Sequence, residues 1–116
     1  MALRFKDGAS LAGIQPQAVV GLMVASQVYA EHEIDCWVTS VTDGAQNRLG
    51  TSLHPKGLAF DLRLPSKTWP GPDSPPHLDD DVRALLALRL GTAWDVIKHD
   101  VGSGEHIHVE WDPSHT

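Results

Sequence analysis

The chain has 116 residues, of which 41% are hydrophobic and 21% charged, and its formal net charge is -6. This length suits one core, so we expect a single domain over residues 1–116. The negative charge disfavours nucleic acid as a partner, because no basic face is easily assembled. Cys36 is the only cysteine, which excludes an internal disulfide, and its apolar neighbours favour a buried thiol over a nucleophile.

No segment has the length and apolar character of a membrane span. The first residues also lack the apolar core and cleavage site of a signal peptide. We therefore expect a protein made in the cytoplasm without membrane insertion, which needs another component for any route outward.

The first half of the chain predicts a helix and a strand. Pro16 is a favourable first-turn residue, and apolar positions at helical spacing continue to about Glu31. Residues 35–41 are rich in Val, Trp and Thr, which is typical of a strand. A polar loop then runs over residues 43–55.

The second half predicts three strands and a helix. Apolar residues alternate with Asp61 and Arg63 over residues 58–64, so these two share the polar face of a strand. Five prolines and one glycine in residues 65–76 predict a surface loop without regular structure. A helix follows from the aspartates at 79–81 to Gly91.

The chain then ends in two strands, residues 94–98 and 107–111, which a hairpin loop over residues 100–104 can join. Two helices and four short strands predict an α+β domain with a small antiparallel sheet and helices packed on one side. The tryptophans in the strands are expected in the core, and four histidines are expected at the surface without a role. These residues are Trp37, Trp94, Trp111, His32, His77, His99 and His115.

Alternation in the last strand puts His106, His108 and Glu110 on one face, against an apolar face for the core. Asp61 also points away from the core, so it can meet the two histidines if the strands are neighbours. His54 lies in the preceding loop, and a glycine at 57 lets the chain turn back toward Asp61. Two imidazoles and a carboxylate are typical ligands of a catalytic zinc site with one position left to water, although other divalent ions accept the same ligands.

These residues form two motifs. The first is Ser-x-His-x-x-Gly-x-Ala-x-Asp, which ends at Asp61, and the second is Glu-x-x-His within a His-x-His, which ends at His108. The pair resembles the motifs of the M15 zinc peptidases, which include D-Ala-D-Ala carboxypeptidases, dipeptidases and phage endolysins. The resemblance implies the fold that these enzymes share with the hedgehog signalling domain.

The resemblance also implies roles for individual residues. One Zn2+ ion would be held by His54, Asp61 and His108. Glu105 would be the general base that takes a proton from the zinc-bound water and passes it to the leaving amine. His106 would stabilise the oxyanion or orient the water.

The chain departs from the M15 pattern at a substrate-binding arginine, which the family usually carries in a Ser-Gly-Tyr-Arg-like segment after the first strand. Residues 39–44 contain no arginine. Arg48 in the following loop and Arg63 beside Asp61 are the candidate substitutes, and Ser52 is a further candidate for substrate binding.

We therefore expect a monomeric zinc metallopeptidase that cleaves a peptide bond of peptidoglycan, either endolysin-like or DD-carboxypeptidase-like. The small size and missing leader indicate a bacteriophage enzyme that reaches the cell wall after release by a permeabilising partner, or as part of a virion. One alternative is a non-catalytic, zinc-stabilised structural or binding domain, such as a virion component. Another is a cytoplasmic dipeptidase acting on free D-Ala-D-Ala.

Overall fold

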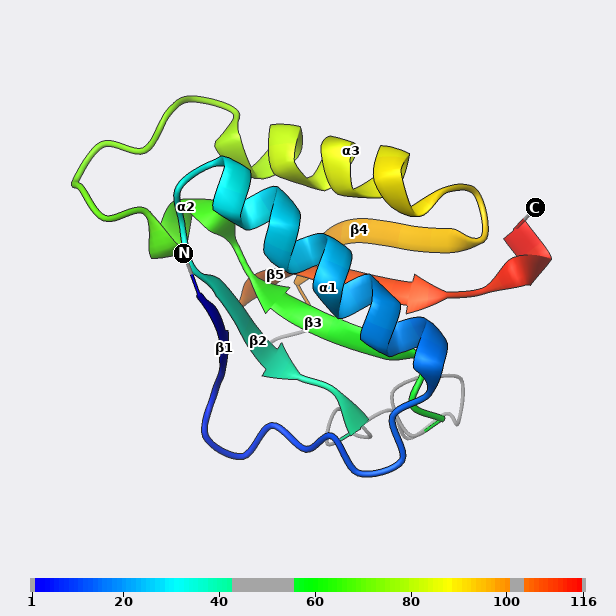
Figure 1. Ribbon diagram of the computed structural model, residues 1–116. Helices are drawn as coiled ribbons and strands as arrows, with labels where there is room; N and C mark the ends of the chain where they lie inside the picture. The colour runs from blue at the N-terminus through cyan, green and yellow to red at the C-terminus, as the bar shows by residue number, and fades with distance from the viewer. Residues whose placement is uncertain (1, 43–55, 101–103, 116) are drawn as a thin grey trace.

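A computed structural model describes residues 2–42, 56–100 and 104–115 of the protein (Figure 1). Within them lie five strands, three α-helices and one short 3-10 helix. In chain order these are β1 (Leu3–Phe5), α1 (Pro16–Glu31), β2 (Cys36–Ser40), β3 (Ala59–Arg63), α2 (Pro65–Thr68), α3 (Leu78–Leu90), β4 (Trp94–Asp100), β5 (Glu105–Trp111) and the 3-10 helix Pro113–His115. The protein is therefore an α+β fold, as predicted. No described helix is long and apolar enough to cross a membrane.

The sheet has the strand order β1-β2-β3-β5-β4. The pairs β2–β3, β3–β5 and β4–β5 are antiparallel, as expected, but β1 pairs with β2 in parallel. The prediction of an antiparallel sheet is thus wrong at one edge, where a three-residue strand was not foreseen. The sheet is mixed because β1 and β2 are linked through α1, a crossover that brings the chain back in the same direction.

Helix α1 begins at Pro16 and ends at Glu31, as the apolar spacing predicts. Its buried side packs on the sheet close to β4, because a Cβ added at Gly21 would lie 2.7 Å from the Trp94 ring. Tyr29, also on α1, donates a hydrogen bond of 2.8 Å to the backbone carbonyl of Arg63. These contacts hold the helix across β3, where Figure 1 shows it in front of the sheet.

Helix α3 packs on β4 and beside α1, so both helices cover the same face of the sheet. Before it, the segment expected to lack regular structure contains α2. Asp79, from the first turn of α3, accepts hydrogen bonds of 2.7 Å from the backbone nitrogen and from Oγ of Ser66. The short helix exists because a residue thirteen positions away satisfies a donor in its first turn, which local composition does not reveal.

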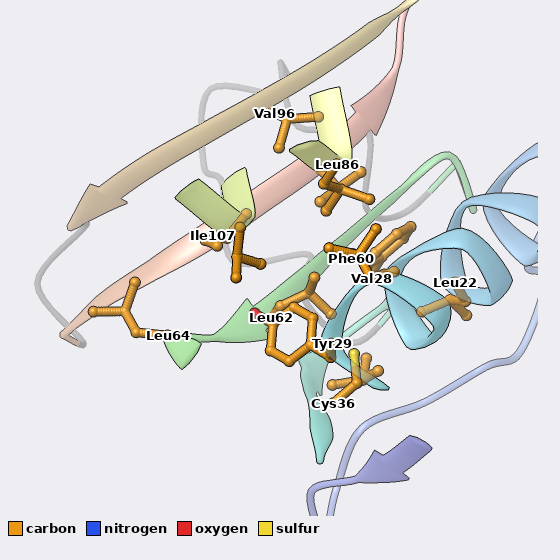
Figure 2. Packing of buried hydrophobic residues seen from close by; sticks show 14 of the residues in the cluster. Leu22, Val28, Tyr29, Cys36, Phe60, Leu62, Leu64, Leu86, Val96 and Ile107 are labelled. Carbon is orange, nitrogen blue, oxygen red and sulfur yellow. The ribbon is translucent and has the colours of Figure 1, made fainter. Parts of the chain in front are cut away.

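One apolar core lies between the two helices and the sheet. Figure 2 shows the side chains converging from both layers, with the labelled residues Leu22, Val28, Tyr29, Cys36, Phe60, Leu62, Leu64, Leu86, Val96 and Ile107. Cys36 is buried, as predicted. Trp37 was expected in this core but lies on the opposite face of β2, because Cys36 and Val38 occupy the inward positions.

Strand alternation gives the sheet a second face that points away from α1 and α3. We call it the polar face. It is formed by the residues of β3, β4 and β5 that alternate with the core residues and point to the opposite side of the sheet. Its polar residues in these strands include Asp61, Arg63, Asp95, His99, His106, His108 and Glu110. The two motifs identified in the sequence meet on this face.

Candidate metal centre

Asp61 and His108 lie directly opposite each other on the neighbouring strands β3 and β5. Side chains at such positions share a face, with their Cβ atoms about 5 Å apart. The Asp61 Oδ1 atom consequently lies 2.8 Å from Nδ1 of His108. The predicted convergence of these two residues is confirmed, and the sheet register is its cause.

A second pair is formed across β4 and β5, where His99 lies opposite His106. Their Nε2 atoms are 3.0 Å apart and the rings meet edge to face, with centroids separated by 4.7 Å. The ring of His99 also lies beside that of His108, at a centroid separation of 5.2 Å. His106 and His108 are almost fully buried, with 9% of each residue exposed.

His99 was expected at the surface, but it is half-buried and contacts the rings of His106 and His108. The expected strand ended at Lys98, whereas β4 continues to Asp100. Alternation within the longer strand turns His99 to the same face as Asp95, while Val96 points into the core. This alternation is visible in the sequence, but the expected strand stops two residues before the end of β4.

Within the described residues, Asp61, His99 and His108 form a group that can hold a metal ion, because one ligand atom from each lies within 4.8 Å of the others. Ligand atoms of a tetrahedral site with bonds of about 2.1 Å are roughly 3.4 Å apart. Small side-chain rotations would therefore bring the three atoms into a coordination shell. One carboxylate oxygen and two imidazole nitrogens suit several divalent transition metals.

His108 is held from both sides by carboxylates. Nε2 of His108 lies 2.6 Å from Oε1 of Glu110, in addition to the Nδ1 contact with Asp61. Burial alone would lower the pKa of His108, but the hydrogen bonds to Asp61 and Glu110 outweigh it and raise the pKa above its ordinary value. Glu110 therefore fixes the orientation of the His108 ring, as an outer partner does for a histidine that binds a metal.

Glu105, the predicted general base, is not brought to this group. It opens β5 on the same strand face as Ile107, which points into the core, and its side chain is exposed. Lys98 has a raised pKa, chiefly because of its hydrogen bond to Asp80 of α3, and Glu105 contributes to this shift. Glu105 therefore lies near Lys98 on the helical side of the sheet, and its catalytic role stays a prediction.

The remaining predicted residues divide into two groups. His54, Arg48 and Ser52 lie outside the described residues. Arg63 lies on the polar face two positions from Asp61, and its Cζ atom is 4.9 Å from the centre of the Trp37 ring, within cation–π range. Its place beside the cluster is consistent with substrate binding, which stays a prediction.

No protein-family model matches the chain, and neither a curated protein nor a solved structure matches it. The features that bear on function are therefore the two motifs and the pairing of β3 with β5 that joins them.

Proposed function

We propose that the protein is a zinc-dependent peptidase that hydrolyses a peptide bond of peptidoglycan, with a fold of the hedgehog/DD-peptidase kind. The observation that carries the proposal is the pairing of Asp61 with His108 across β3 and β5. Asp61 ends the first motif and His108 ends the second, so residues 47 positions apart meet at 2.8 Å. In the M15 peptidases that the motifs resemble, these two positions are zinc ligands.

Bound zinc would lower the pKa of a water molecule from ~16 to about 7 and polarise the substrate carbonyl. Asp61 and His108 would hold the ion, with His54 as the third ligand that the motif predicts. Glu110 accepts a hydrogen bond from His108 and keeps its ring oriented. The motif assigns His106, whose Nε2 lies 3.5 Å from Asp61 Oδ1, the role of orienting water or stabilising the oxyanion.

Proton transfer is assigned to Glu105 by the Glu-x-x-His motif alone. We expect Glu105→Gln to bind zinc like the wild type but to lose hydrolysis by at least about 100-fold, the usual contribution of a general base. The measurement is mass spectrometry of products released from defined peptidoglycans, with and without a chelator. Glu110→Gln is the matched variant, expected to weaken zinc binding as well as hydrolysis. Unchanged hydrolysis by Glu105→Gln would remove this residue from the mechanism.

The competing proposal is a zinc-stabilised structural or binding domain, such as a virion component. It is favoured by the position of Glu105 on the opposite side of β5 and by the near-complete burial of His106 and His108. A structural zinc site is usually closed by four protein ligands, whereas a catalytic site keeps a position for water. Stoichiometric zinc binding without a chelator-sensitive product from any wall type would favour this alternative.

A further inference from the structure

We propose that His99 of β4 is a metal ligand, so that Asp61, His99 and His108 form a three-ligand zinc site carried entirely by the sheet. This inference deepens the proposed function, because it rests on the same site binding zinc, but it does not depend on peptidase activity. It differs from the motif-based ligand set, in which the third ligand is His54 and β4 contributes nothing.

The register of the sheet brings the three side chains together. β5 lies between β3 and β4, so His108 has Asp61 on one side, while the ring of His99 approaches it from the other strand at a centroid distance of 5.2 Å. Each ligand therefore comes from a different strand, and backbone ladders tie the three strands together. Such a framework positions ligands more rigidly than a loop does.

The hydrogen bonds of His106 and His99 determine which nitrogen of each neutral ring carries the proton. Nδ1 of His106 lies 3.1 Å from the carbonyl oxygen of Gly104, which can only accept, so this nitrogen carries a proton. The lone pair of a neutral His106 is then on Nε2, which accepts a hydrogen bond of 3.0 Å from the Nε2–H group of His99. A neutral His99 that donates in this way carries its lone pair on Nδ1, so the ring keeps one nitrogen of the kind that coordinates a metal ion.

His108 has a carboxylate beside each of its ring nitrogens. Its Nδ1 faces Asp61 and its Nε2 faces Glu110, at 2.8 and 2.6 Å. A metal ion beside Asp61 would replace the proton on Nδ1 and leave the Nε2 proton donated to Glu110. The same carboxylate–imidazole arrangement thus serves both the metal-free and the metal-bound protein.

The test is zinc affinity, measured by competition with a chromophoric chelator, together with the visible absorption of the Co(II)-substituted protein. We expect His99→Ala to weaken zinc binding by more than the roughly 10–100-fold that loss of an outer partner costs, and to change the Co(II) spectrum. His99→Gln keeps an N–H donor for His106 but lacks Nδ1, and we expect the same loss. His32→Ala, at the end of α1, is the matched control and should bind like the wild type.

Zinc binding by His99→Gln within about threefold of the wild type, with an unchanged Co(II) spectrum, would overturn the proposal, since His99 would then act only through His106. Far-UV circular dichroism of the metal-free variants separates loss of a ligand from loss of the fold. If the wild-type protein releases no peptidoglycan fragment yet His99→Gln loses zinc, the peptidase function fails while the ligand assignment stands.

Discussion

At the scale of single residues, Cys36 shows how burial decides chemistry. Its side chain lies in the core beneath α1 (Figure 2), and burial raises the pKa of the thiol to about 12. The thiol therefore stays protonated throughout the range in which an ordinary cysteine, with a pKa of about 8.5, becomes a nucleophilic thiolate. This agrees with the sequence-based prediction of a buried thiol.

We accordingly expect no reaction of native Cys36 with iodoacetamide between about pH 7 and pH 9. At about pH 8 a group of pKa 12 is ionised in roughly one molecule in ten thousand, and burial also blocks access. Mass spectrometry should show complete labelling after unfolding in guanidinium chloride and none before it. Rapid labelling of the native protein would mean that the core opens around β2.

At the scale of elements, Gly57 joins the segment before α1 to the start of β3. Its φ angle is +72°, and a Cβ added there would lie 2.2 Å from the backbone oxygen of Gly13. The Gly57 carbonyl also accepts a hydrogen bond of 3.0 Å from the backbone nitrogen of Gln15. The glycine of the first motif is therefore needed for the fold as well. It lets the chain turn into β3 in close contact with the backbone of residues 13–15.

Gly57→Ala should lower the free energy of unfolding by about 2–5 kcal/mol. Two costs add: an alanine is strained in the left-handed conformation, and its Cβ overpacks against the neighbouring backbone. Gly8→Ala is the matched control, because Gly8 has a φ of +91° but no atom within 4 Å of an added Cβ, so a loss of about 1–2 kcal/mol is expected. Urea unfolding with unchanged m-values measures both. Equal losses in the two variants would show that the contact with Gly13 contributes nothing.

The elements also show what could be predicted from the sequence. The boundaries of α1 and α3 followed from apolar spacing, Pro16 and Gly91, which are local signals. β1 was missed because three half-exposed or exposed residues carry no periodicity, and its partner β2 lies about thirty positions away. The end of β4 was misplaced because its length is set by pairing with β5, a tertiary contact.

At the scale of the whole molecule, the candidate site depends on the pairing of strands that are far apart in the sequence. Only some of these pairings can be predicted from the sequence. Asp61 and His108 could be predicted to face each other because alternation and the two motifs agree. His99 belongs to neither motif, so its place in the cluster emerges only when β4 is laid beside β5. Helices α1 and α3 and the core between them and the sheet occupy one strand face, so the other face remains for polar chemistry.

A metal bound by Asp61, His99 and His108 would connect β3, β4 and β5, so zinc should stabilise the whole domain. At a free zinc concentration of about 100 times Kd, binding to the native state alone contributes about 2.7 kcal/mol. For a domain of this size that corresponds to a rise in Tm of roughly 10 °C. Differential scanning calorimetry should show this rise with zinc and its reversal by EDTA. Mg2+ is the control, because it prefers oxygen ligands and should leave Tm unchanged. A Tm insensitive to zinc at every concentration would mean that the cluster does not bind the ion in the folded protein.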